Sequence, residues 1–162
     1  MTFQLTEEEY VRAQLGYWTR VRSPNRIRIL MAIAVLNLMI SVCILVIPWF
    51  EDKSIAWVFL AVGAFLLVDR YWLAPYRLRR LFRRSPNARS VRRVVITDEG
   101  MEIVMPNSSD NLKWAAFQKA HELDAEFLLM YAPNAFVIMP KRVFDEGGLV
   151  QFRSMLAKNG LV

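Results

Sequence analysis

A strongly apolar run without charge, at residues 29–50, constrains this chain more than any other feature. Its 22 residues, ILMAIAVLNLMISVCILVIPWF, make a helix of about 33 Å, enough to cross a hydrocarbon core of about 30 Å. A signal peptide is the competing interpretation, but 28 residues precede the run and Pro48-Trp49-Phe50 is not a small-residue cleavage site. Residues 29–50 are therefore predicted to be a transmembrane helix.

A second apolar run follows a short polar turn at residues 51–53. Residues 54–68 carry no charge, but 15 residues are short for a membrane span. Extending the run to residue 74 supplies the missing length, because Arg70 can reach the headgroups and the next aromatic residues anchor there. A buried core helix is the alternative. The adjacent first span favours a second transmembrane helix and thus a two-helix hairpin.

Positive charge lies on the outer flanks of this hairpin. Five arginines precede the first span and nine lie between residues 70 and 93, whereas the turn holds one lysine and two acids. The positive-inside rule then predicts a multi-pass protein of the bacterial cytoplasmic (inner) membrane with both termini in the cytoplasm. The predicted interface anchors are aromatic: Trp49 and Phe50 outside, and Tyr71, Trp72 and Tyr76 inside.

Two residues within the spans are predicted to lie at the helix–helix contact. Asn37 can donate a hydrogen bond across to the second helix, and Gly63 permits close approach. A ligand or ion path is the alternative. Acids, lysine and histidine are missing from the middle of both runs, which argues against an ion pathway within one chain.

An arginine-rich link is expected at residues 75–89, as a helical extension with a narrow apolar stripe. Its arginines are candidates for contact with lipid headgroups: Arg77, Arg79, Arg80, Arg83 and Arg84. Each basic residue near an anionic leaflet contributes about 1 kcal/mol. They also serve to set topology, and the two roles are compatible. Nucleic-acid binding is disfavoured, because no aromatic platform accompanies the cluster.

Residues 90–162 change to a strand pattern. Strands are predicted at residues 91–97, 101–105, 112–122, 127–131 and 135–139, with a loop at 106–111. Asp98-Glu99-Gly100 reads as a turn in which Gly100 takes a positive φ. Asp145 is expected to cap a final helix that ends near Lys158.

The N-terminal residues 1–28 are predicted to contain a strand and a helix. Residues 2–5 suit an edge strand, and Thr6 with Glu9 matches a capping box. We expect the strand to join the C-terminal sheet, so that the two spans interrupt one cytoplasmic domain.

Recognisable catalytic chemistry is absent from the sequence, and no catalytic, cofactor-binding or metal-binding residue is assigned. Cys43 and His121 are the single cysteine and histidine, and no nucleotide or zinc motif occurs. His121 and Glu122 alternate along a strand, so they face opposite sides. Trp114 is interpreted as core, and residues 140–142 as a charged turn rather than a phosphate contact.

Several short stretches together are similar to the YcxB-like family of small bacterial membrane proteins. They are Phe3-x-Leu5-Thr6-x-Glu8-x-Tyr10, Thr97-Asp98-Glu99-Gly100, Trp114, the segment FVIMPKRVF from Phe136, and Phe152-Arg153. The resemblance implies a C-terminal domain similar to bacterial pleckstrin-homology (PH)-like folds, a bent antiparallel sheet closed by a helix. It implies no activity.

The expected fold class is an α+β membrane protein, with a two-helix transmembrane hairpin and a small cytoplasmic antiparallel domain. The expected function is non-enzymatic: a docking or regulatory module at the inner leaflet that binds a protein partner or anionic lipid. Two alternatives stay open. One is a toxin-immunity or stress-protection protein, and the other is a transporter or channel subunit that works as a homo-oligomer.

Overall fold

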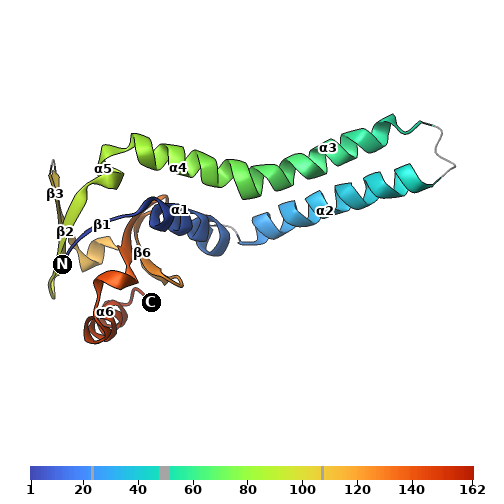
Figure 1. Ribbon diagram of the computed structural model, residues 1–162. Coiled ribbons are helices and arrows are strands. Elements are labelled where there is room, and N and C mark those ends of the chain that lie inside the picture. Colours follow the sequence, from blue (N-terminus) through green and yellow to red (C-terminus); the bar gives the residue numbers. More distant parts are fainter. Residues whose placement is uncertain (23, 48–51, 107) are drawn as a thin grey trace. The chain divides into compact units, whose positions relative to one another are not determined.

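The computed structural model describes residues 1–22, 24–47, 52–106 and 108–162 (Figure 1). The chain forms two compact units. One unit, here the globular unit, combines residues 1–17 with residues 79–162, and the other comprises residues 18–78. The globular unit is therefore assembled from both ends of the chain.

The unit of residues 18–78 is a helical hairpin. Helix α2, Pro24–Val46, begins five residues before the predicted span, with proline at its first position, where a missing N–H costs nothing. Helix α3, Ser54–Val68, passes through a π-helical segment, Asp69–Leu73, into α4, Ala74–Arg84. Pro75 cannot donate its backbone hydrogen bond, and π-helical turns are one way in which a helix accommodates such a position.

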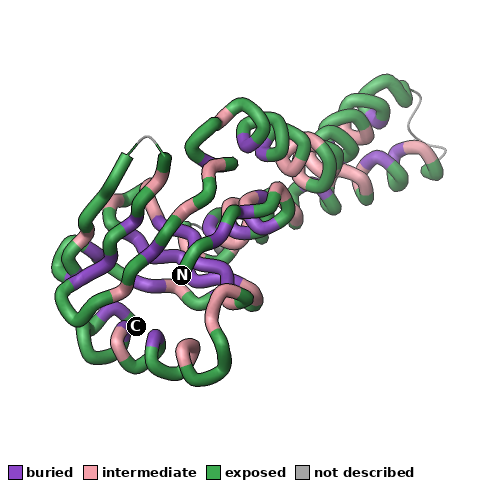
Figure 2. Tube along the Cα trace, turned by 60° about the vertical axis from the view of Figure 1, so that its left-hand side comes forward, coloured by how far each residue is buried: buried purple, intermediate pink, exposed green. Residues whose placement is uncertain are grey.

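Two helices in the described chain are long and apolar enough to cross a membrane, Asn25–Val46 and Ser54–Arg84. A core helix of a soluble protein would be mostly buried. These helices instead expose most of their large apolar side chains, as the green hairpin in Figure 2 shows. Trp49 and Phe50, two of the predicted interface anchors, lie outside the described residues.

Small residues form the contact between α2 and α3. Ala34, Ser41 and Ala56 are fully buried, and the Ser41 hydroxyl donates to the Ala56 carbonyl at 2.9 Å. A Cβ added to Gly63 would lie 2.9 Å from Leu38 Cγ and 3.0 Å from the Ala34 carbonyl, so glycine permits this approach. The prediction for Asn37 was wrong in its partner. Its amide donates to the Ile33 carbonyl of its own helix at 2.8 Å, and Ser41 makes the interhelical bond.

The globular unit contains two antiparallel sheets. The first has the order β1 (Thr2–Gln4), β2 (Val91–Ile96), β3 (Gly100–Met105) and β4 (Ser108–Lys113). The second has the order β5 (Lys119–Glu122), β6 (Glu126–Ala132) and β7 (Ala135–Pro140). This unit also contains three helices: α1 (Glu7–Gly16), α5 (Pro86–Arg89) and α6 (Glu146–Lys158). The fold class is thus α+β with antiparallel sheets.

The N-terminal strand joins the first sheet, as predicted. β1 pairs antiparallel with β2, and the terminal ammonium of Met1 donates to the Val94 carbonyl at 2.8 Å. Phe3 and Leu5 are 6% and 2% exposed, so their side chains belong to the core. In Figure 1 the blue β1 lies beside the green β2.

The capping box that begins α1 is also confirmed. The backbone N–H of Glu9 donates to the Thr6 hydroxyl, and the Thr6 N–H donates to the Glu9 carboxylate at 2.9 Å. The two residues satisfy two of the donors that a helix start leaves free.

Two predictions in the first sheet were wrong. Within the predicted loop, Ser108 to Asn111 belong to strand β4, whose ladder with β3 is made by the backbone while its polar side chains stay mostly exposed. Gly100 does not adopt a positive φ. Among the described glycines, Gly160 is the one that does. Gly100 is required for space, since an added Cβ would lie 2.3 Å from the Leu112 carbonyl oxygen of the neighbouring strand.

The second sheet packs with α6 around aromatic side chains. Phe127 of β6 and Phe152 of α6 meet edge to face with ring centroids 5.2 Å apart, and Phe144 stacks on Phe152 at 4.8 Å. Asp145 caps α6 by accepting from the Gly148 N–H at 2.7 Å, as predicted. Trp114 is buried and donates from its indole to the Thr97 carbonyl at 3.0 Å. The predicted strand at residues 112–122 is divided by a 3₁₀ turn into parts of β4 and β5.

Candidate functional site

Three of the five candidate arginines are paired with carboxylates. In the globular unit, Arg83 donates to Glu7 from Nε at 2.8 Å and from Nη2 at 3.1 Å, and Arg79 Nε lies 3.8 Å from the same carboxylate. In the hairpin, Arg77 Nη2 lies 3.0 Å from Asp69 Oδ1. The hydrogen bond from Arg83 lowers the pKa of the Glu7 carboxyl. The pairs of Arg79 and Arg83 with Glu7 hold α1 against the end of α4 within the globular unit.

Arg80 and Arg84 have a different environment. Both are exposed, and within the described residues no ion pair or hydrogen bond holds either guanidinium. They lie one turn apart on α4, about 160° around the helix from Phe82. Phe82 is buried against the ring of Tyr10 at 5.3 Å. The two free arginines therefore point away from the core of the globular unit.

The described aromatic anchors are exposed on the hairpin unit. Tyr71, Trp72 and Tyr76 show 66%, 74% and 64% of their surface. Three large aromatic side chains in adjacent helical turns are rarely all exposed when they face only water.

Helix α1 is fastened to the second sheet by further ion pairs. Arg142, in the turn after β7, donates to Glu9 at 2.5 Å and 3.0 Å and to the Gln4 carbonyl at 2.8 Å. Arg142 and its neighbour Lys141 thus both have carboxylate partners, which agrees with the charged turn expected at residues 140–142. Glu7 and Glu9 thus fasten α1 within the globular unit.

Glu122 links three elements of the globular unit. Its carboxylate accepts from Arg153 of α6 at 2.7 Å and from Lys141 at 2.6 Å. The hydrogen bond from Arg153 lowers the pKa of Glu122 to about 2, although partial burial opposes that shift. His121 faces the other way, and burial, with Lys119 nearby, lowers the pKa of its imidazole. Within the described residues, no group of three or more His, Cys, Asp or Glu side chains is arranged to hold a metal ion.

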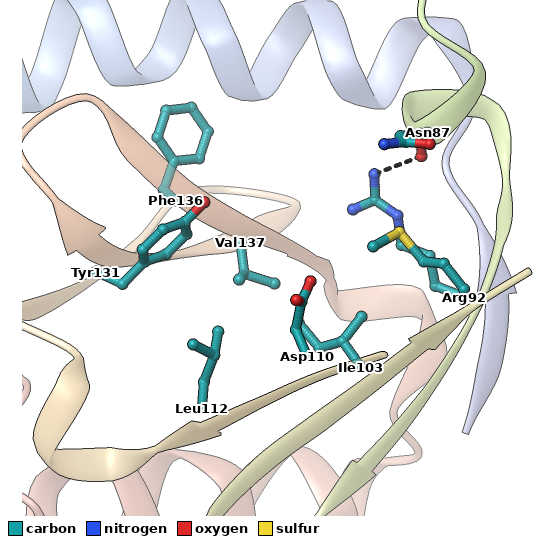
Figure 3. A pocket seen from close by; sticks show the side chains of 9 residues that line it. Asn87, Arg92, Ile103, Asp110, Leu112, Tyr131, Phe136 and Val137 are labelled. Carbon is teal, nitrogen blue, oxygen red and sulfur yellow. Dashed lines mark hydrogen bonds between the residues drawn. The ribbon is translucent and has the colours of Figure 1, made fainter. Parts of the chain in front are cut away.

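A cavity of about 300 Å³ opens between the two sheets of the globular unit (Figure 3). Arg92 of β2 and Asp110 of β4 line it, together with Tyr131 and Phe136 from the second sheet. None of these four residues was predicted from the sequence to line a cavity. The sequence signal that could have indicated such a cavity is a charged residue at an inward position of a strand. Which positions face inward is known only once the strand register is known.

The architecture defines a class: an α+β protein in which a hairpin of two apolar helices interrupts an antiparallel globular unit after its first strand and helix. Residues 96–156 match the family model of the YcxB-like protein, which confirms the resemblance over this segment. No curated protein and no solved structure matches the chain.

Proposed function

We propose that this chain is a non-enzymatic, multi-pass protein of the bacterial inner membrane, with both termini in the cytoplasm. Its PH-like globular unit is a docking or regulatory module held at the inner leaflet. The length and exposure of the two apolar helices support membrane insertion. The arginines on both outer flanks of the hairpin support this orientation.

Arg80 and Arg84 carry the proposal that the module contacts anionic lipid. They are two guanidinium groups one turn apart on α4 that have no partner among the described residues, and α4 directly continues the second apolar helix. Guanidinium groups bind phosphate oxygens well, because their donors match the geometry of the oxyanion. The paired Arg79 and Arg83 stabilise the attachment of α1 instead.

The test compares two double variants with the same change in charge. The full chain is reconstituted in nanodiscs of mixed phosphatidylcholine and phosphatidylglycerol, and the phosphatidylglycerol retained after limited delipidation is quantified. Arg80→Gln with Arg84→Gln is expected to remove most of the enrichment, since each charge contributes about 1 kcal/mol. Arg79→Gln with Arg83→Gln is expected to reduce enrichment less and to lower the melting temperature. Equal enrichment in wild type and in the Arg80/Arg84 variant would overturn the lipid contact.

Topology is tested separately, with reporter domains fused to each end of the chain. We expect reporters that are active only in the cytoplasm to work at both ends. A periplasmic signal at either terminus would overturn the orientation. A protein partner of the module is sought by crosslinking in intact cells, and the variant with Arg80→Gln and Arg84→Gln is compared with the wild type.

A further inference from the structure

The cavity between the sheets has one cationic and one anionic wall. Arg92 donates from Nη2 to the Asn87 carbonyl at 3.1 Å, and its Nε has no hydrogen-bond partner among the described residues. Asp110 lines the same cavity, and its carboxylate has no hydrogen-bond or ion-pair partner in the described chain. Figure 3 shows both side chains around the opening, with the rings of Tyr131 and Phe136 on another wall.

Arg92 occupies a core-facing position. It pairs with Phe3, which is 6% exposed, and Val94, two residues further along β2, is 1% exposed. Residues opposite each other in a sheet point to the same face, and so do alternate residues of one strand. The guanidinium is thus directed to the side of the sheet that apolar side chains normally fill. Its burial lowers the pKa of Arg92.

Asp110 violates the pattern of its sheet in the same way. It pairs with Ile103, which is buried, and the next residue on its face is Leu112. An acid at this position would be expensive inside a packed core. Asp110 is exposed on the edge strand β4 and lines the cavity.

Tyr131 reaches the cavity through an irregularity of the second sheet. The pairing of β6 with β7 shifts register between Met130 and Ala132, which places Tyr131 at a bulge. Bulges redirect a side chain and are common beside functional sites. Phe136, on β7, is held by the ring of Tyr17 at 4.8 Å. Three departures from local sheet rules therefore converge on one cavity.

We propose that this cavity binds a small zwitterion with an apolar body, the chemistry of a free apolar amino acid. Its carboxylate meets the guanidinium of Arg92, its ammonium meets the carboxylate of Asp110, and its side chain lies against Leu112 and Phe136. A phosphate dianion is a poorer match, because Asp110 repels it and a single arginine neutralises only part of its charge. A cavity of this size lies at the lower end of the range for small-molecule sites.

The experiment is calorimetric titration of the full chain in nanodiscs of phosphatidylcholine. The probes are phenylalanine and leucine, with 3-phenylpropanoate lacking the amine, phenethylamine lacking the carboxylate, and glycine lacking the apolar body. We expect the two apolar amino acids to bind. Phenylpropanoate and phenethylamine are each expected to bind about 10- to 100-fold more weakly, because each loses a hydrogen bond to a charged group. Glycine is also expected to bind more weakly, because it loses the apolar contact with Leu112 and Phe136. Glycerol 3-phosphate tests the phosphate alternative, and binding as tight as that of phenylalanine would overturn the proposal.

Variants locate the site. Arg92→Gln and Asp110→Asn are each expected to reduce phenylalanine affinity to that of the corresponding truncated probe. The matched controls are Arg93→Gln and Glu102→Gln, exposed residues at outward positions of β2 and β3. Unchanged affinity in both cavity variants, or no heat with either apolar amino acid at millimolar concentration, would overturn the site. The Arg80/Arg84 variant should bind phenylalanine normally, so this test stands apart from the lipid contact.

Discussion

The carboxylate of Glu126 is completely buried on β6, with Oε1 3.8 Å from Nε of Arg12 on α1, and neither of its oxygens accepts a hydrogen bond within the described residues. Burial raises the pKa of Glu126, Glu9 and Asp124 add to the rise, and Arg12 opposes it. Folding therefore makes the Glu126 carboxylate harder to ionise than it is in the unfolded chain. Arg12 is about half exposed, so water solvates it without this partner.

Glu126→Gln is predicted to raise the free energy of unfolding by about 1 kcal/mol at neutral pH, because it removes a buried charge that lacks hydrogen bonds. Because the pKa of Glu126 is raised in the folded state, the contribution of Glu126 to stability is complete below its unfolded pKa of 4.5. That contribution is lost as the pH rises through the folded-state pKa. The gain should therefore vanish near pH 4. Melting temperatures of the full chain across pH check this, with Glu102→Gln as the control. A destabilised variant at pH 7 would contradict it.

Glu122 should show the opposite dependence on pH. Its pKa is lowered to about 2, so its contribution is present above pH 4.5 and is lost as pH falls toward 2. Because its side chain is 36% exposed, Glu122→Gln is expected to cost less than about 1 kcal/mol at pH 7. The difference in melting temperature between wild type and variant should close on acidification. A difference that widens on acidification is the result against it.

The N-terminal strand is predicted to be essential to the globular unit. Deletion of residues 1–5 removes the buried side chains of Phe3 and Leu5, each contributing about 1.5–3 kcal/mol. It also leaves the edge of β2 without its partner. We expect a sharply lower melting temperature and faster proteolysis after residue 79. Wild-type stability of the truncated chain would show that β1 adds nothing.

Gly100→Ala is predicted to destabilise the protein by about 1–3 kcal/mol, because the new methyl group would clash with the backbone of β4. Gly147→Ala is the matched control, since a Cβ there meets nothing within 4 Å and alanine suits a helix. The control should be neutral or slightly more stable. Equal effects of the two substitutions in thermal unfolding would show that the close approach at Gly100 is relaxed without cost.

Gly63→Ile is predicted to separate the two helices of the hairpin. The bulky side chain would meet Leu38 and the Ala34 carbonyl, whereas Ala61→Ile, on an exposed position of α3, is the control. Ser41→Ala, which removes the bond to Ala56, should cost about 1 kcal/mol. Disulfide trapping between cysteines placed across the hairpin measures the separation. Equal trapping in the Gly63 and Ala61 variants would be inconsistent with this packing.

Local chemistry made much of the fold predictable. The capping box at Thr6, the cap at Asp145 and the hairpin of β6 and β7 each follow from residues close in sequence. The pairing of β1 was inferable because an apolar edge strand needs a partner. β4 was missed, since its polar residues match a loop and its order comes from backbone bonds to β3.

The candidate sites were less accessible to sequence reasoning. The arginine cluster was visible, but the sequence could not separate Arg80 and Arg84 from their neighbours, because Glu7 lies some seventy positions away in the chain. Asn37 was misassigned because an amide in a helix can bond either across or back along its own turn. The cavity depends on register and on a bulge, and both are fixed by tertiary packing.

The pairing of β1 with β2 imposes an order on biosynthesis. β1 is synthesised before its partner β2, which begins at Val91, after both apolar helices have been made. The first sheet therefore stays incomplete throughout translation of the hairpin, and the nascent β1 carries an unpaired strand edge during that interval. The first sheet is completed when β1 pairs with β2, after the whole hairpin has been synthesised. A protease that cuts near residue 5 would consequently distinguish chains stalled at the hairpin from finished ones.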